Sequence, residues 1–504
     1  MSDQLMTATG TRAFPLDGDD RTTLIHGEWR RGRGGDPVEV RDPSDNRTFL
    51  SVVPASPDDV NAAVASSWRA FYESWGRSPG MDRGDTIRRL AQLMRDHVED
   101  LAELEARNTG IPLKQSRFEV VSAARHFDFF AGLAGKIEGI SADLPDGRLM
   151  YGLREPWGVV AQIVPWNTPL KLLARGCAAA LACGNTVVVK PSIVAGASVL
   201  LWGKLAQEAG FPAGVINIVP GSGRSTGSTL VNHPDVRKIV FTGGGVGGEE
   251  VLADAGRQVT PVLAELGGKG PIIVCEDADL DEAAAGIVSQ AFARQGQVCF
   301  AGTRLLVPAS IHDELVAKVA ERANRLTVGP AMDESSQLGP LISPEHRADV
   351  VAYLDEAVAE GCTIVEGGGV PDDPALAEGN FLRPTLVTGV VQSQRIATDE
   401  IFGPVLTVQV YEDLEQAIVD SNATDFGLAS YIWTRDIRRA LHLARRLECG
   451  NVFINTYRYA SEVPFGGWKG SGMGREHGLE ALREYTQLKT VVVGMDPWVD
   501  PVLS

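Results

Sequence analysis

The stretch GVVAQIVPWNTPLKLLARGCAAALACGNTVVVKP, residues 158–191, decides the fold because two hydrophobic patterns alternate along it. Residues 158–165 form a short apolar run, which predicts a buried strand. Thr168 followed by Pro169 predicts the N-cap and first turn of a helix, and Gly184 predicts its end. A second apolar run occupies 186–191. The stretch therefore predicts a strand, a helix and a second strand, the βαβ unit of a parallel sheet.

The same alternation continues along the chain. A helix is expected at 197–210, with strands at 215–221 and 238–243. The rhythm restarts with a strand at 271–276, a helix at 280–293 and a strand at 303–308. These patterns predict an α/β protein with two units. The first unit comprises residues 1–140 and 158–267, and the second comprises 268–475.

Two segments fit neither unit. Residues 141–157 resemble a hairpin with its turn at Pro145-Asp146-Gly147, and the tail 484–504 contains one more strand pattern, TQLKTVVVGMDP. Strands outside both cores would leave exposed edges, and proteins usually cover such edges. We therefore expect these segments to form a small β oligomerisation element in a homodimer or homotetramer.

Composition excludes several classes of function. The 504 residues carry a formal net charge of −18, so neither nucleic acid nor an anionic membrane is an expected partner. The first twenty residues lack a signal-peptide pattern, and no apolar run reaches the roughly 18 residues of a membrane helix. The six cysteines are scattered and the eight histidines do not cluster, which favours the cytoplasm and no metal site.

Two glycine-rich stretches follow strands. PGSGRSTG follows VINIV, and FTGGGVGG, which follows KIV, contains G-x-G-x-x-G at Gly243, Gly245 and Gly248. Between a strand and a helix, such glycines let backbone N–H groups approach a pyrophosphate. The alternative is a tight turn that needs positive φ. No G-x-x-x-x-G-K-[ST] occurs, so a P-loop hydrolase is not predicted.

Three polar residues are candidates for chemistry. Cys299 lies in RQGQVCFAGTR with no histidine nearby, Glu265 ends an apolar strand before two glycines, and Asn167 follows the first strand. A thiolate is a nucleophile, a partly buried carboxylate is a base, and an amide can donate to an oxyanion. From the residues alone, Glu265 could equally be a solvated strand end and Asn167 a helix cap.

The chain resembles the aldehyde dehydrogenase superfamily, specifically its hydrolytic NAD(P)-dependent members. The resemblance runs from about residue 25 to 490, through IVPWNTP, VVVKPS, FTGG, LAELGGK, GQVC, EIFGPVL and PFGGWKGSGMGRE in this order. It implies a Rossmann-like dinucleotide-binding domain and a second α/β catalytic domain. The implied reaction oxidises an aldehyde to its acid through a cysteine thiohemiacetal and thioester while NAD or NADP is reduced.

The resemblance also implies a role for each matching residue. Cys299 matches the nucleophile, Glu265 the general base that activates water, and Asn167 the oxyanion donor. Implied cofactor contacts are Ile163, Trp166, Lys190, Ser192, Gly223, Arg224, Thr242, Gly243, Gly244, Val246, Leu266, Glu400 and Phe402. The implied substrate tunnel contains Thr168, Leu172, Arg175, Val298, Phe300, Tyr459 and Phe465. A base that acts on water explains why no histidine accompanies Cys299.

Four positions depart from the family pattern. Gly244 replaces a serine that would contact pyrophosphate. Ile193 replaces a glutamate that would hold both ribose hydroxyls, and for this reason we expect use of NADP as well as NAD. Thr168 replaces a larger aromatic residue, which predicts a wider tunnel. Arg175 occurs in relatives that act on semialdehyde carboxylates and in others that act on aromatic aldehydes, so it leaves the substrate open.

Two alternative functions were weighed. A CoA-acylating dehydrogenase needs no water-activating base, so Glu265 argues against it. A catalytically inactive structural or binding homologue is disfavoured because Cys299, Glu265 and Asn167 are all present.

Overall fold

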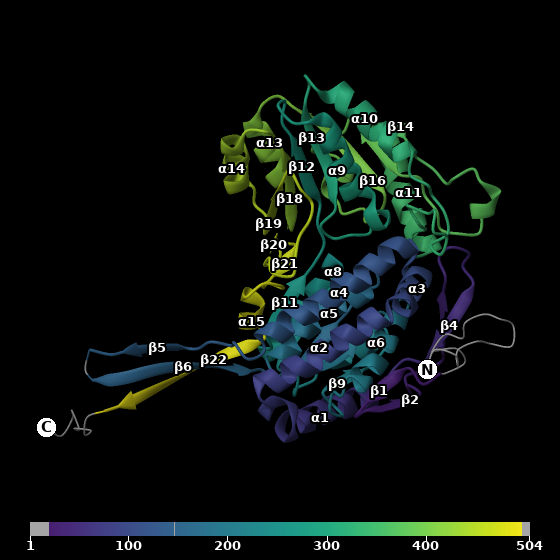
Figure 1. Ribbon diagram of the computed structural model, residues 1–504. Coiled ribbons are helices and arrows are strands. Elements are labelled where there is room, and N and C mark those ends of the chain that lie inside the picture. Colours follow the sequence, from purple (N-terminus) through teal and green to yellow (C-terminus); the bar gives the residue numbers. More distant parts are fainter. Residues whose placement is uncertain (1–19, 146, 496–504) are drawn as a thin grey trace.

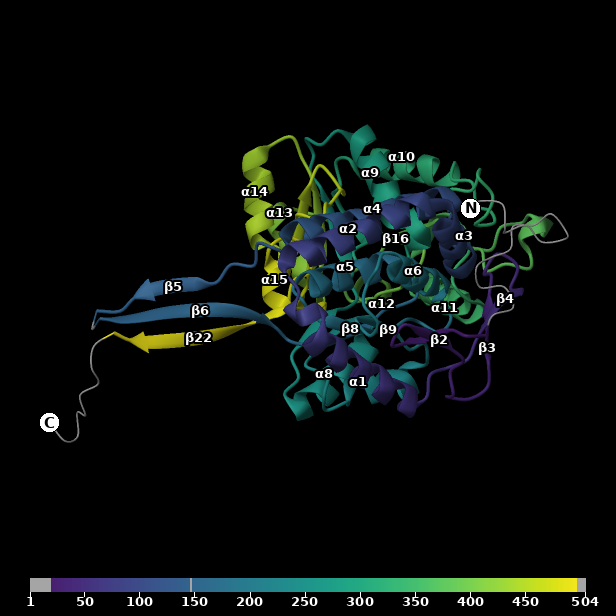
Figure 2. The same cartoon turned by 60° about the horizontal axis from the view of Figure 1, so that its bottom comes forward.

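The computed structural model describes residues 20–145 and 147–495. It contains two α/β units and a β arm that projects from them (Figures 1 and 2). The structure does not describe residues 1–19, Asp146 at the turn of the expected hairpin, or residues 496–504 of the expected tail element. Among the residues described, no helix has both the length and the hydrophobicity needed to cross a membrane.

The first sheet has eight strands in the order β2-β1-β9-β8-β7-β10-β11-β21, and its five central strands, β9 to β11, pair in parallel. The bounds are β1 Thr23–Ile25, β2 Glu28–Arg30, β7 Val159–Ile163, β8 Thr186–Lys190, β9 Ile216–Ile218, β10 Lys238–Thr242, β11 Val262–Glu265 and β21 Gly472–Met473. The last strand comes from far along the chain and pairs antiparallel to β11. Residues 472–473 therefore complete the first sheet rather than the second.

Helices cover both faces of this sheet. Val160 of β7 belongs to the core under one helical layer, while Val159 and Ala161 belong to the core under the other. The first layer contains α2 Gly80–Asp96, α3 Val98–Thr109, α4 Leu113–Leu133, α5 Pro169–Ala182 and α6 Ala197–Glu208; the second contains α1 Pro57–Glu73, α7 Ser228–Val231 and α8 Gly245–Gln258. Alternate side chains of a strand point to opposite faces, so this sheet is a buried, doubly wound one.

The second sheet has seven strands in the order β14-β15-β16-β13-β12-β18-β19, with only β14 antiparallel. The strands are β12 Gly270–Val274, β13 Gly302–Pro308, β14 Thr363–Glu366, β15 Thr385–Thr388, β16 Val405–Tyr411, β18 Ala429–Trp433 and β19 Asn451–Ile454. The helices of this unit are α9 Leu280–Phe292, α10 His312–Asn324, α11 Pro344–Ala359, α12 Arg395–Thr398, α13 Leu414–Asn422 and α14 Ile437–Arg446. Neighbouring residues Ile272 and Ile273 of β12 again pack into different cores.

The arm is a three-stranded antiparallel sheet in the order β22-β6-β5. Its strands are β5 Ile140–Asp143, β6 Arg148–Pro156 and β22 Thr486–Gly494, and α15 Glu480–Glu484 leads into the last one. Figures 1 and 2 both show these strands extending away from the body. Shorter pairs are β3 Val38–Arg41 with β4 Thr48–Val52, and β17 Phe426–Gly427 with β20 Trp468–Lys469.

The predicted α/β class and the strand–helix–strand unit of 158–191 are confirmed. The predicted helix start, with Thr168 as N-cap and Pro169 in the first turn, is also confirmed, although another side chain supplies the hydrogen bond. Thr168 occupies the N-cap position of α5, but its side chain makes no capping hydrogen bond. Instead, the N–H of Leu170 donates to Oε1 of Glu105 at 3.1 Å. A buried carboxylate on α3 therefore satisfies the helix N-terminus that the sequence assigned to the threonine.

Candidate active site

The order of the first sheet reverses between β7 and β10. The chain proceeds outward from β7 to β8 and β9, then returns to β10 on the other side of β7. In parallel sheets, the crevice outside the carboxyl ends of strands at such a point is the usual ligand site. Val164 to Asn167 follow β7 here, and Gly243 to Gly245 follow β10. The candidate residues therefore meet at the place where the topology opens the sheet.

The glycine loop after β10 leaves room for a ligand. A Cβ placed on Gly244 or Gly245 would meet no protein atom within 4 Å, whereas one on Gly248 would lie 2.4 Å from the Leu266 side chain. Helix α8 begins at Gly245 without a side-chain cap, and the buried hydroxyl of Thr242 has no hydrogen-bond partner. Free N–H groups at a helix N-terminus suit a pyrophosphate.

The alternative explanation of this loop, a turn that needs positive φ, is wrong. None of the glycines from Gly243 to Gly248 has a positive φ. Helix α8 begins at Gly245, so the second and third glycines of the motif are already helical. Gly243 approaches the Phe241 ring, where a Cβ would lie at 2.6 Å, and Val246 in the first turn is 77% exposed.

Residues for the adenosine end lie on the neighbouring strands. Lys190 ends β8, and its Nζ donates to the carbonyls of Gly221 at 2.9 Å and Pro191 at 3.1 Å. Burial lowers the pKa of Lys190 to about 8. Ser192 is half-buried, and Arg224 is exposed in the turn Gly223–Gly227. A Cβ on Gly223 would meet nothing within 4 Å, so this loop is also open.

The nicotinamide-end candidates come from the second unit and from β7. Glu400 Oε1 accepts a hydrogen bond from the N–H of Gly268 at 2.9 Å. Burial raises the pKa of Glu400 to about 7, although this hydrogen bond acts to lower it. Phe402 has a positive φ of 57°, and its carbonyl is bonded by His346 at 2.8 Å. Trp166 packs edge-on against Phe402 with centroids 5.3 Å apart. Ile163, at the end of β7, and Leu266, after β11, are both buried in the core of the first unit.

The backbone before Cys299 is strained. Arg294 and Gln295 have φ values of 53° and 59°, and Gly296 follows at 69°, which is three left-handed residues in succession. Such conformations cost roughly 1–3 kcal/mol per non-glycine residue and persist only where surrounding structure enforces them. The Gln295 side chain donates to the carbonyl of Gly110 at 2.8 Å. At Gly296 a Cβ would lie 2.1 Å from the Gly403 carbonyl oxygen.

This loop brings Cys299 against Glu265 and Asn167. The amide of Asn167 donates to the carbonyl of Gln297 at 3.0 Å, so it is not the helix cap that was considered. Glu265 is the last residue of β11 and is 1% exposed, so a solvated strand end is excluded. At Gly268 a Cβ would lie 2.4 Å from the Cys299 carbonyl oxygen. Gly268 therefore permits the close approach of this segment to the cysteine loop, whereas at Gly267 a Cβ would lie 2.2 Å from a carboxylate oxygen of Glu400.

The electrostatics of the site are set by burial. Burial raises the pKa of the half-buried Cys299 thiol to about 12, with the Arg175 guanidinium opposing and the Glu265 carboxylate adding to the shift. Burial, followed by the neighbouring Glu476 carboxylate, also raises the pKa of Glu265, while Arg175 lowers it. A carboxyl with a raised pKa can act as a base near neutral pH.

Sequence reasoning missed two sets of charged partners. Arg175 forms an ion pair with Glu476 at 2.7 Å. Glu119 on α4 pairs with Lys171 at 2.6 Å and with Arg294 at 2.8 Å. Glu476 lies within the quoted motif PFGGWKGSGMGRE, so a signal for it existed. The pairing of α4 with α5 and the cysteine loop has no local signal, because the partners are far apart in the chain.

Aromatic side chains adjoin Cys299. The Phe300 ring packs edge-on against Tyr459 at 5.3 Å and against Phe465 at 5.6 Å. Val298 and Cys299 belong to the same cluster as these rings. Leu172 and Thr168 are buried on α5 and at its N-cap. The residues assigned to the tunnel therefore lie around the cysteine loop and along α5.

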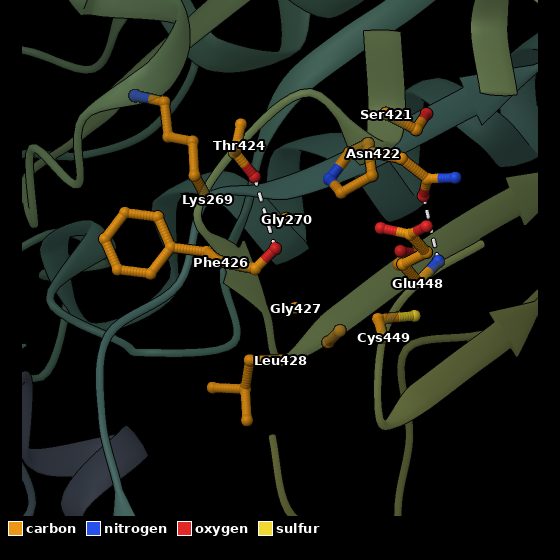
Figure 3. A pocket seen from close by; sticks show the side chains of 13 residues that line it. Lys269, Gly270, Ser421, Asn422, Thr424, Phe426, Gly427, Leu428, Glu448 and Cys449 are labelled. Atoms are coloured by element: carbon orange, nitrogen blue, oxygen red, sulfur yellow. Dashed lines mark hydrogen bonds between the residues drawn. The ribbon is translucent and has the colours of Figure 1, made fainter. Parts of the chain in front are cut away.

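A small cavity is lined by Lys269 and other residues, none of which is a candidate catalytic residue (Figure 3). Its volume is about 10 Å³, room for about one water, and its lining includes Gly427, Glu448 and Cys449. Lys269 extends away from Glu448 and Cys449. This cavity is too small for an aldehyde. Within residues 20–145 and 147–495, no group of three or more His, Cys, Asp or Glu residues is arranged to hold a metal.

Comparisons with known proteins agree with this geometry. The model of the "Aldehyde dehydrogenase family" matches residues 29–491. Betaine aldehyde dehydrogenase of Bacillus subtilis is 39% identical, covering 95% of this chain and 98% of its own. Hydroxyisobutyraldehyde dehydrogenase of Mycolicibacterium austroafricanum is 38% identical, covering 97% of each. The crystal structure of betaine aldehyde dehydrogenase from Staphylococcus aureus in complex with NAD+ is 35% identical, with a TM-score of 0.94 over 97% of this chain and 98% of that one.

These matches extend along nearly the whole chain and include enzymes that share both its fold and its sequence. The chain belongs to the aldehyde dehydrogenase family, and it is an NAD(P)-dependent enzyme that oxidises an aldehyde to the carboxylic acid.

Proposed function

We propose that Cys299 is the nucleophile of this oxidation, with Glu265 as the general base that activates water and Asn167 as the oxyanion donor. The observation that carries the proposal is the convergence of the cysteine loop on the end of β11 and on the segment after β7. Cys299 attacks as the thiolate, its proton having passed to solvent, and its sulfur forms a bond to the aldehyde carbon. Arg175 favours the thiolate, because its charge opposes the effect of burial on the pKa of Cys299.

The oxyanion of the resulting thiohemiacetal is held by the Asn167 amide and the N–H of Cys299. Each such donor contributes on the order of 3 kcal/mol to the transition state. The bound dinucleotide accepts the hydride that leaves this carbon. Cys299 then holds the acyl group as a thioester. Glu265 takes a proton from water, whose oxygen attacks the thioester carbon, and the acid departs as the Cys299 sulfur is released.

Several residues suit the dinucleotide. The open loops at Gly223 and Gly244, the free N-terminus of α8 and the unpartnered Thr242 hydroxyl fit its phosphates and ribose. Lys190 is proposed to hold the adenosine ribose and Glu400 the nicotinamide ribose. Because Ile193 carries no charge that would repel a 2′-phosphate, we propose that both NAD and NADP are accepted.

The direct test supplies a panel of aldehydes with NAD or NADP and no CoA. The proposal requires one acid and one reduced cofactor for each aldehyde consumed. Oxidation that appears only when CoA is added, with an acyl-CoA as product, would support the CoA-acylating alternative. An absence of turnover across the panel would support the inactive homologue.

We also propose the remaining assignments made from the sequence. Residues 1–140 and 158–267 form the dinucleotide-binding domain, and 268–475 form the catalytic domain, except that the strand 472–473 joins the first sheet. Residues 141–157 with 484–504 form the oligomerisation element of a homodimer or homotetramer. The exposed edges of the arm support the last of these. All six cysteines, each among the described residues, are free thiols, which is typical of a reducing compartment such as the cytoplasm.

A further inference from the structure

The side chains around Cys299 carry an uneven distribution of charge. Three cations lie there on α5 and in the cysteine loop: Lys171, Arg175 and Arg294. Three carboxyls face them: Glu119, Glu265 and Glu476. Three cations and three fully ionised carboxylates would have no net charge. The ion pairs divide these side chains into two groups, and the groups differ in net charge.

Arg175 forms ion pairs with two of these carboxyls. Its guanidinium lies 2.7 Å from Glu476 and 3.8 Å from Glu265. Burial raises the pKa of both carboxyls, so at neutral pH they carry fewer than two negative charges between them. This group of three is therefore close to neutral and adds little net charge to the site.

The other group has one carboxylate for two cations. Glu119 forms ion pairs with both Lys171 and Arg294. Burial alone would raise the pKa of its carboxyl, but the charges of Arg294 and then Lys171 outweigh this effect and hold the pKa below its usual value. The buried His126, on α4, and His477 have ring centres 4.4 Å apart and are close enough to Lys171 and Arg175 for those charges to affect them. Burial lowers the pKa of each imidazole well below its usual value, so they add no charge at neutral pH. One positive charge remains in excess.

The aromatic rings near the cysteine are already matched with these cations. Lys171 Nζ lies 5.1 Å from the centre of the Tyr459 ring, and the Arg175 guanidinium lies 4.5 Å from that of Phe465. Arg294 lies 6.0 Å from the Phe300 ring. Aromatic faces are the groups that recognise quaternary ammonium ligands. Here the protein's own cations take those positions and would repel a second cation.

We propose that this enzyme selects aldehydes whose far end is a carboxylate and discriminates against cationic aldehydes, through the excess positive charge of Lys171 and Arg294 over Glu119. This inference rests on the proposed function and adds its substrate class. It separates the chain from the relatives named for betaine aldehyde, although their sequences are 35–39% identical. The carboxylate can be carried by an aliphatic chain or by an aromatic ring.

The test measures kcat/KM for two matched series. The aromatic series is 4-carboxybenzaldehyde, 4-methylbenzaldehyde and 4-(trimethylammonio)benzaldehyde; the aliphatic series is succinic semialdehyde, pentanal and betaine aldehyde. We expect the order anion, neutral, cation in at least one series, with about 100-fold between the ends. The series with the higher values identifies the carrier of the carboxylate. Any other order in both series overturns the inference, whereas no oxidation of any aldehyde overturns the proposed function itself.

Two variants of opposite sign test the mechanism of selection. Lys171→Met removes the excess charge and should lower the anion-to-neutral ratio of kcat/KM about tenfold or more. Glu119→Gln increases the excess and should raise this ratio. A merely structural disturbance would lower kcat/KM for every member of a series and leave the ratio alone. Lys318→Met, which removes a surface lysine paired with Asp281, is the matched control. Ratios unchanged in both test variants overturn the inference.

Discussion

The guanidinium of Arg175 lies 3.8 Å from the carboxylate of Glu265, and neither side chain is exposed to solvent. The pair links α5 to the end of β11. Arg175 is the main charge that opposes protonation of Glu265, since burial and the Glu476 carboxylate both raise the pKa of Glu265. The charge state of the proposed base therefore depends on a residue in the chain's first unit.

Arg175→Met should shift the pH profile of kcat to higher pH. Without the guanidinium, the pKa of Glu265 rises further, and its basic form is populated only at more alkaline pH. The limb on which kcat increases with pH should move accordingly, while Arg175→Lys, which keeps the charge, should move it less. Thermal denaturation checks that each variant is folded. A profile that is unchanged, or shifted toward acid, contradicts this role of Arg175.

Glu265→Gln should slow deacylation more than hydride transfer. The amide cannot take the proton from water, so the thioester accumulates on Cys299. Stopped-flow absorbance should show a burst of reduced cofactor followed by a slow steady state. The surface variant Glu480→Gln, on α15, is the control. Wild-type turnover in Glu265→Gln would mean that another group activates water.

The arm should mediate assembly. Leu488 and Val492 lie on one face of β22 and are 47% and 51% exposed. Light scattering of the wild type should give at least twice the 53.9 kDa mass of the chain. Val492→Glu should shift the mass toward the monomer, because it places a charge on an apolar face.

The control for the arm is Val365→Glu, which alters an exposed valine on β14, the edge strand of the second sheet. It should leave the mass unchanged. A wild-type mass of 53.9 kDa at micromolar concentration would exclude the arm as a stable interface.

NADP should be used with an efficiency comparable to that of NAD. Lys190 and Ser192 can donate to a 2′-phosphate, and the exposed Arg224 can add a second charge. A charge-assisted hydrogen bond contributes roughly 1.5–3 kcal/mol. Arg224→Ala should therefore lower kcat/KM for NADP about tenfold or more and leave the value for NAD nearly unchanged. Arg257→Ala, which removes an arginine in the last turn of α8, is the control.

A preference for NAD above about a hundredfold, unaffected by Arg224→Ala, would mean that these side chains do not receive the phosphate. A hundredfold corresponds to about 2.7 kcal/mol, which is the contribution expected of one such bond.

Local patterns predicted much of the fold. Pro169 begins α5 because its fixed φ suits the first turn of a helix, and Gly184 follows the end of α5 in a left-handed conformation. Both effects act within one turn. Apolar runs identified β7, β8 and β10 for the same reason. The antiparallel pairing of β21 with β11 had no such signal, because it joins residues about 200 positions apart. Pairing at that distance depends on the whole fold rather than on a local preference.

The candidate site divides in the same way. Cys299, Glu265 and Asn167 were identifiable because each lies in a motif of its own. The left-handed Arg294 and Gln295 were not, since no local preference favours that conformation in two such residues. It is enforced by contacts from other elements, such as the Gly110 carbonyl. The Lys171–Glu119–Arg294 group likewise depends on tertiary packing alone.

We predict that Cys299 carries the acyl group as a thioester during turnover. The most direct measurement is mass spectrometry of Glu265→Gln quenched with acid during turnover, with Cys299→Ala and the buried, distant Cys362→Ala as comparisons. We predict one acyl adduct per chain on the peptide that contains Cys299, its loss together with activity in Cys299→Ala, and its retention when Cys362→Ala is combined with Glu265→Gln. An adduct on another residue, or more than a few per cent of wild-type turnover in Cys299→Ala, would contradict the account.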